Sequence, residues 1–153
     1  MSTVKHLEFS ATIHAPVPTV WRLMIGPESY KRWACAFAEG TYFEGSWGQG
    51  AKIWFLSPPS GDGMVAEIAQ NREGEFISIR HLGVKSHGVE DTTSEAVRAW
   101  APMHEDYSFI SVGDGTKLLV ELDAPDEWAS YMNEAWPRAL ALLKRMSEAD
   151  SAA

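Results

Sequence analysis

Residues 125–146, PDEWASYMNEAWPRALALLKRM, decide the fold of this 153-residue chain. Their apolar side chains recur at steps of three and four, which is the period of one face of an α-helix. At 1.5 Å per residue, such a helix would span roughly 30 Å. A helix with one apolar face has to bury that face against another layer of the protein. The predicted face comprises Trp128, Tyr131, Met132, Ala135, Ala139, Leu142, Leu143 and Met146.

Local signals predict where this helix begins and ends. Asp123 is a suitable N-cap, and Pro125 fits the first helical turn, where no N–H is needed. Lys144 and Arg145 would lie at the negative end of the helix dipole. Pro137 removes one internal hydrogen bond, so we expect a kink that lets the helix follow a curved sheet.

The chain before this helix is typical of an antiparallel sheet. Residues 4–14 alternate as a first strand, and residues 17–24 and 28–33 predict two short helices. From residue 38 onward, short apolar runs are separated by turns rich in Gly, Pro, Asn and Asp, as in an antiparallel meander. These runs predict strands at 39–47, 50–57, 64–70, 75–84, 104–112 and 116–122.

A break at about 85–103 interrupts the strands. Thr92-Thr93-Ser94-Glu95 matches a helix capping box, and Pro102 would stop the helix that follows it. This helical insertion is either a lid over a cavity mouth or a surface decoration. The complete pattern predicts an α+β fold in one domain over residues 1–153, with a curved antiparallel sheet wrapped around the long C-terminal helix.

Composition excludes several classes of function. The 21 acidic residues outnumber the 13 basic ones, which gives a net charge of −8 that repels nucleic acid and anionic membranes. No run of about 18 apolar residues could span a membrane. The N-terminus lacks the apolar stretch of a signal peptide, so we expect a cytoplasmic protein.

No motif for metal, cofactor or nucleophilic chemistry is present. Cys35 is the single cysteine, and its apolar neighbours predict a buried, inert thiol. The five histidines show no metal-site spacing, so we expect no metal. Neither a nucleophile elbow nor a phosphate-binding glycine loop occurs. We therefore expect no cofactor and assign no catalytic residue.

Four motifs carry a resemblance to a known family. They are Ile13-His14-Ala15-Pro16 before residues 20–24, Gly26-Pro27-Glu28 before Trp33, Gly45-Ser46-Trp47-Gly48-Gln49-Gly50, and Pro125-Asp126-Glu127-Trp128 before residues 136–140. With these motifs the chain resembles the START-like (SRPBCC) superfamily, which includes the birch pollen allergen type. Within it, the chain is similar to the branch of homologues of the heat shock protein 90 ATPase activator. The resemblance implies a helix-grip fold, and it leaves function open among lipid carriers, hormone receptors, cyclases and co-chaperones.

Strand alternation predicts which side chains face the final helix. Ile79 and His81 share the apolar face of their strand, and Glu105, Tyr107 and Phe109 share a face of the strand after the break. An inward His81 and Glu105 would form a buried polar pair. The two side chains either satisfy each other's hydrogen-bonding groups or orient a ligand. The predicted ligand-cavity residues are Trp54, Ile79, His81, Glu105, Tyr107, Phe109, Trp128, Tyr131, Met132 and Ala135.

We weigh three functions for such a domain. The leading hypothesis is a binding protein for a small hydrophobic, aromatic or amphipathic ligand held between the sheet and the C-terminal helix. The first alternative is a cyclase- or hydrolase-like enzyme that uses His81, Glu105 and Tyr107. The second is a module that interacts with a chaperone, as the branch resemblance implies. The seven tryptophans either fill the core or line the cavity, and a homodimer is left open.

Overall fold

The computed structural model describes residues 4–152. An eight-stranded antiparallel sheet forms one layer, with strand order β1-β8-β7-β5-β4-β3-β2 and with β6 paired to β5. The strands are β1 (Val4–Ile13), β2 (Tyr42–Gly45), β3 (Lys52–Ser57), β4 (Asp62–Arg72), β5 (Phe76–Ser86), β6 (Val89–Asp91), β7 (Met103–Val112) and β8 (Gly115–Pro125). The helices are α1 (Val17–Ile25), α2 (Pro27–Ala34), α3 (Glu95–Arg98) and α4 (Asp126–Ala152).

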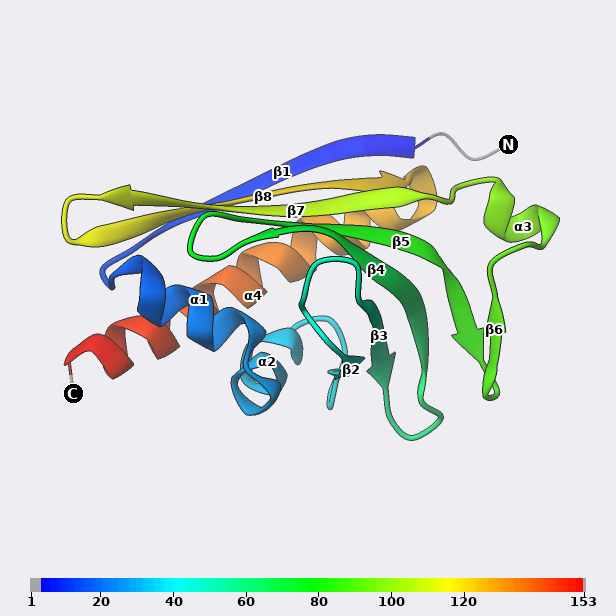
Figure 1. Ribbon diagram of the computed structural model, residues 1–153, viewed down its shortest axis with the longest axis horizontal. Coiled ribbons are helices and arrows are strands. Elements are labelled where there is room, and N and C mark those ends of the chain that lie inside the picture. The colour runs from blue at the N-terminus through cyan, green and yellow to red at the C-terminus, as the bar shows by residue number, and fades with distance from the viewer. Residues whose placement is uncertain (1–3, 153) are drawn as a thin grey trace.

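Helices α1, α2 and α4 lie together on one face of the sheet, and α4 runs along most of its length (Figure 1). This arrangement confirms the predicted α+β helix-grip class. The core between the layers is made by the inward residues of the strands and by the apolar face of α4. Its fully buried members include Ile13, Met24, Ile77, Leu118 and Leu143. Within residues 4–152, no helix is both long enough and apolar enough to cross a membrane.

Helix α4 differs from its sequence-based prediction at both ends. Asp123 does not cap it, because β8 continues to Pro125 through its pairing with β1. The helix also runs past Met146 to Ala152. Its last turns are held by contacts that are distant in sequence: Arg22 of α1 donates to Asp150 at 2.6 Å, and the His14 N–H donates to Glu148 at 2.9 Å. Pro137 lies inside α4, and the predicted kink stays a prediction.

The interruption at 85–103 contains less helix than predicted. Strand β5 continues to Ser86, and β6 turns back to pair with it. Only α3 is helical, and its cap is Ser94 rather than Thr92, since the Ser94 hydroxyl accepts from the Val97 N–H. Gly83 makes this arrangement feasible, because a Cβ at that position would lie 2.0 Å from the backbone oxygen of Asp91. Figure 1 shows α3 and β6 together at one end of the sheet.

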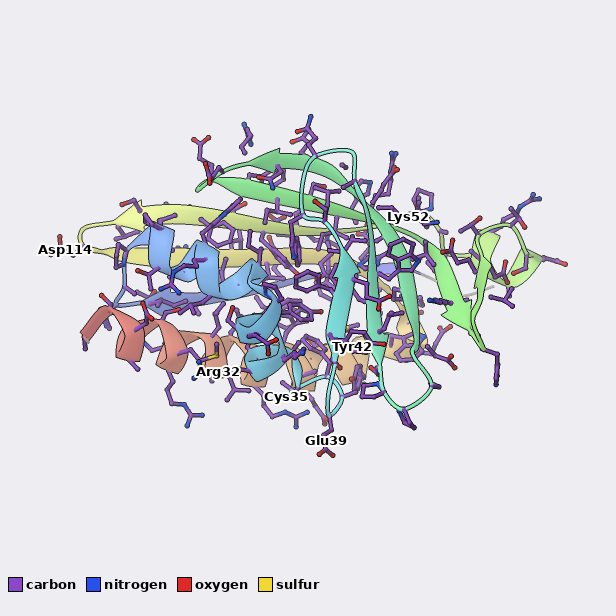
Figure 2. All side chains as sticks on the ribbon, turned by 60° about the horizontal axis from the view of Figure 1, so that its bottom comes forward. Arg32, Cys35, Glu39, Tyr42, Lys52 and Asp114 are labelled. Carbon is purple, nitrogen blue, oxygen red and sulfur yellow. The ribbon has the colours of Figure 1, made fainter. Side chains whose placement is uncertain are left out.

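Two further predictions were wrong. The predicted strand at 39–47 is formed only over Tyr42–Gly45. Cys35 is exposed rather than buried, and its thiol donates to the Arg32 carbonyl at the end of α2 (Figure 2). Apolar neighbours in the sequence did not bury this thiol, because Cys35 is the C-cap of a short helix whose buried side is formed by Tyr30, Trp33 and Ala34.

Candidate functional site

A cavity of about 520 Å³ lies between the sheet, α2 and the first half of α4. Ligand sites commonly have volumes of about 300–1,000 Å³ and mostly apolar walls. The floor comes from β3, β4, β5, β7 and β8, and the roof from α2 and α4. The lining residues are Tyr30, Trp33, Phe37, Ala38, Thr41, Phe55, Ser57, Gly63, Met64, His81, Val84, Trp100, Met103, Glu105, Tyr107, Leu122, Asp123, Ala124, Pro125, Trp128, Tyr131, Met132 and Trp136.

Aromatic rings form much of the wall and contact one another around it. Trp136 is the centre of this group, with ring centroids 5.0 Å from Phe37, 5.9 Å from Tyr107 and 6.0 Å from Trp33. The Trp33 indole N–H donates to the Met24 carbonyl at 3.2 Å, which fixes that ring between α1 and the cavity. Rings that pack on each other in this way present a rigid apolar surface to the cavity.

A hydrogen-bonded group of polar side chains interrupts the apolar wall. His81 Nε2 lies 3.1 Å from Glu105 Oε1, and the Tyr107 hydroxyl donates to the other oxygen of Glu105. Strand pairing brings these residues together: Glu105 on β7 is the register partner of Ile79 on β5, so His81 is its diagonal neighbour on the same face. Glu105 therefore holds both a histidine and a phenol at the cavity wall.

Burial keeps the phenols of this site protonated. The pKa of Tyr107 is well above its ordinary value, first because the ring is buried and then because Glu105 carries a negative charge beside it. The pKa of Tyr30 is raised for the same two reasons, in the same order. A phenol with a raised pKa remains a hydrogen-bond donor across the neutral and mildly alkaline range.

Tyr131 ties α4 to the segment that follows α2. Its hydroxyl donates to the Phe37 carbonyl, and its ring lies 6.5 Å from the Phe37 ring. Burial also raises the pKa of this phenol, while the nearby Arg138 opposes the shift. Both residues line the cavity, so this contact joins α4 to the segment after α2 at the cavity wall.

Six of the ten predicted residues line the cavity: His81, Glu105, Tyr107, Trp128, Tyr131 and Met132. The other four do not. Trp54 points to the opposite face of β3, where its indole N–H donates to Glu90 at 2.8 Å. Ile79 and Ala135 are fully buried in the core. Phe109 packs 4.9 Å from Trp21 near the far end of β7.

Sequence reasoning missed several lining residues. Phe55 shares the inward side of β3 with the fully buried Ile53, so strand parity alone would have selected it in place of Trp54. Trp136 follows Ala135 on the helix and was omitted from the predicted face, although it is 2% exposed. Tyr30, Phe37 and Trp100 come from short elements whose orientation no periodicity reveals.

A second hollow, of about 690 Å³, lies at the opposite end of the sheet. Its walls are mostly the chain turns at Pro16–Pro18, Gly74 and Gly113–Gly115, with Asp114 at the tip of the β7–β8 turn (Figure 2). Phe109 is the one aromatic residue among its described lining residues, so it lacks a continuous aromatic wall. The cavity beneath α4 is therefore the candidate site.

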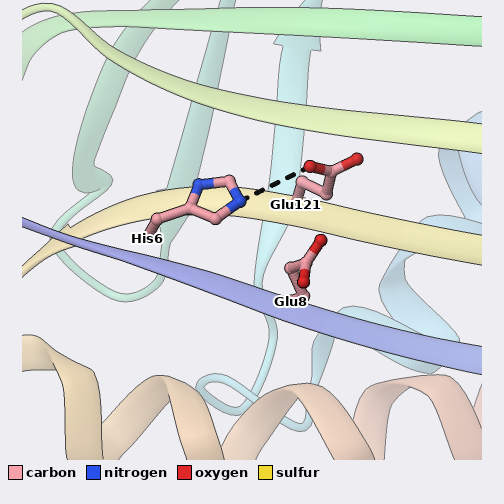
Figure 3. A group of neighbouring side chains, drawn as sticks. All are labelled: His6, Glu8 and Glu121. Atoms are coloured by element: carbon pink, nitrogen blue, oxygen red, sulfur yellow. Dashed lines mark ion pairs between the residues drawn. The ribbon is translucent and has the colours of Figure 1, made fainter.

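A third group lies on the outer face of the sheet (Figure 3). His6, Glu8 and Glu121 bring possible metal-ligating atoms within 4.8 Å of one another. His6 Nε2 is 3.4 Å from Glu121, and Nδ1 is 3.5 Å from Asp123. The pairing of β1 with β8 creates this group, so sequence spacing could not reveal it. Contacts between histidine and carboxylates account for the geometry at this open surface, and we assign no function to it.

Comparison with known proteins supports the fold. No protein-family model matches the chain, and no protein of curated function is detectably similar to it. Among solved structures, CV1439 from Chromobacterium violaceum has a TM-score of 0.69 at 18% identity, over 94% of this chain and 96% of that one. ChR145 from Cytophaga hutchinsonii has a TM-score of 0.70 at 17% identity, over 100% and 99%.

DynU16, from the dynemicin biosynthetic locus, has a TM-score of 0.69 at 15% identity, over 95% of this chain but 48% of its own. These similarities establish the helix-grip fold. At such identities they carry no function across, since one fold hosts many functions. The resemblance to the chaperone-activator branch therefore stays a prediction.

Proposed function

We propose that the protein binds a small hydrophobic or aromatic ligand in the cavity between α4 and the sheet, within one START-like domain. The observation that carries this proposal is a 520 Å³ space with aromatic walls and a hydrogen-bonded polar group made of Glu105, His81 and Tyr107. Apolar ligand surface removed from water contributes about 25 cal/mol per Å², and a few inward polar atoms fix the orientation of the ligand.

The segment that carries α3 is the proposed gate of this cavity. Trp100 lines the cavity from the short connection between α3 and β7. This placement favours the lid over the surface decoration. A ligand could then enter by movement of α3 and β6, without separation of α4 from the sheet.

Replacement of Met132 by arginine tests the proposal. Met132 is half-buried on α4 and lines the cavity, so the longer, charged side chain would occupy the space. We expect the wild type to enhance the fluorescence of the uncharged dye N-phenyl-1-naphthylamine saturably, and Met132→Arg to lose that enhancement with an unchanged circular dichroism spectrum. Val112→Arg is the matched control, because Val112 is 54% exposed at the far end of β7. Equal binding by Met132→Arg and the wild type would reject this site.

A second function uses the same residues as an acid and a base. His81 and Glu105 lie within hydrogen-bond distance at 3.1 Å, which favours a cyclase- or hydrolase-like enzyme. That function predicts turnover of an activated ester such as p-nitrophenyl acetate, and loss of turnover in His81→Ala with folding intact. Turnover that survives in His81→Ala would remove His81 from the chemistry.

A further inference from the structure

The charges that face the cavity are of one sign. Among the lining residues in the described part of the chain there is no lysine and no arginine. Two lining residues carry carboxylates, Glu105 and Asp123. The Asp123 side chain turns to the outer face of β8, where Oδ1 lies 3.5 Å from His6 and Oδ2 accepts from the His104 N–H. Glu105 is thus the carboxylate that faces the cavity.

Glu105 has capacity for a further donor. A carboxylate offers about four lone-pair sites on its two oxygens. Within residues 4–152, Oε1 contacts His81 and Oε2 accepts from Tyr107, so each oxygen retains one site. The Glu105 side chain is 18% exposed, which leaves it accessible from the cavity.

His81 contacts this carboxylate through one ring nitrogen. Its Nε2 faces Glu105, while its Nδ1 is buried and has no hydrogen-bond partner among the described residues. The geometry thus places Nε2 to donate one hydrogen bond to Glu105 Oε1.

The rings around Glu105 add to the negative potential. Tyr107 and Trp136 lie side by side, and Phe55 lies 5.8 Å from His81. Aromatic faces attract cations through the negative charge density above the ring. The protein as a whole carries a net charge of −8, which raises the local concentration of cations and repels anions.

We infer that the ligand carries a protonated amine on an apolar body, with the amine paired to Glu105 and the body against Trp136 and its neighbours. This inference rests on the proposed function, because it assigns the chemical class of the ligand held in the same cavity. A ligand carboxylate would instead meet Glu105 as a like charge in an apolar space, with no lysine or arginine among the described lining residues to pair with it.

A matched series of probes tests the charge preference. The probes 2-naphthylmethylamine, 2-naphthylmethanol and 2-naphthoate share one aromatic body and differ in charge. By isothermal titration calorimetry at neutral pH, we expect the amine to bind the wild type about tenfold more tightly than the alcohol, and the carboxylate to bind more weakly than both. A tenfold difference corresponds to about 1.4 kcal/mol, within the range of a hydrogen bond to a charged group.

Glu105→Gln should abolish the preference for the amine and leave the affinity for the alcohol within about threefold. Asp106→Asn is the matched control: it removes the same charge one residue away, on the opposite face of β7, where Asp106 accepts from Ser78 at 2.6 Å. This control should keep the preference.

The outcomes separate the two proposals. The amine assignment is overturned if the alcohol binds in the cavity but the amine is not preferred, or if Asp106→Asn and Glu105→Gln behave alike. The proposed binding of a hydrophobic ligand would then remain. If no probe binds the wild type, the proposed function itself fails. The order of the three probe affinities for the wild type tests the amine assignment even if Glu105→Gln does not fold.

Discussion

At the scale of the residue, Glu90 shows how one carboxylate holds the proposed gate. Its two oxygens accept from Lys52 Nζ at 2.7 Å and from the Trp54 indole N–H at 2.8 Å, so strand β6 is tied to β3. These hydrogen bonds, that of Lys52 first and that of Trp54 second, lower the pKa of Glu90 below its ordinary value. A lowered pKa in the folded state means that the carboxylate stabilises the fold above its unfolded-state pKa.

Glu90→Gln should therefore loosen β6 and α3 at neutral pH. We expect faster amide hydrogen exchange over residues 84–98 in this variant than in the wild type, after correction for intrinsic rates. The difference should be full above the ordinary carboxylate pKa and should vanish as the pH falls through the lowered pKa of Glu90, because the wild type then also loses the charge. Glu73→Gln, in the exposed turn between β4 and β5, is the control and should leave this segment unchanged. Equal exchange in Glu90→Gln and the wild type would show that the two hydrogen bonds do not hold the gate.

At the scale of the element, the sequence predicts correctly those features that depend on a regular spacing of apolar residues. The apolar steps of α4 and the alternation of β5 and β7 predicted the helix, and they placed His81, Glu105 and Tyr107 on one face. The ends of α4 were wrong because they depend on long-range partners: Val4 pairs with Pro125 at one end, and Arg22 holds Asp150 at the other. No local pattern carries that information.

Irregular segments supply several of the cavity residues that sequence missed. Trp100 reaches the cavity from a connection with no period, and Phe37 from the turn that follows α2. Strand β4 shifts register at Val65/Ala66 and at Ile68/Gln70, so simple alternation does not hold along it. The prediction for Trp54 was wrong because alternation along β3 gives the inward side to Ile53 and Phe55.

At the scale of the whole molecule, the two halves of α4 have different tasks. The C-terminal half packs against the sheet and α1, with Leu143 and Ala139 fully buried. The N-terminal half roofs the cavity, with Trp128, Tyr131 and Met132 along its wall. Close packing at one end supports the stability of the fold, and this leaves the other end free to remain hollow.

Two variants on the same helix should therefore have opposite effects. Leu143→Ala leaves a void in a packed core and should lower the free energy of unfolding by about 2–5 kcal/mol, with dye binding retained at temperatures where the variant is folded. Met132→Arg should lose dye binding but cost about 1 kcal/mol or less, since the cavity has room for the longer side chain. Denaturant unfolding and dye titration measure the two effects on the same samples.

Leu142→Ala, next to Leu143 but half-buried, is the control and should cost less than half as much as Leu143→Ala. If Met132→Arg destabilises the protein as much as Leu143→Ala does, the roof of the cavity belongs to the packed core, and α4 has no division of tasks.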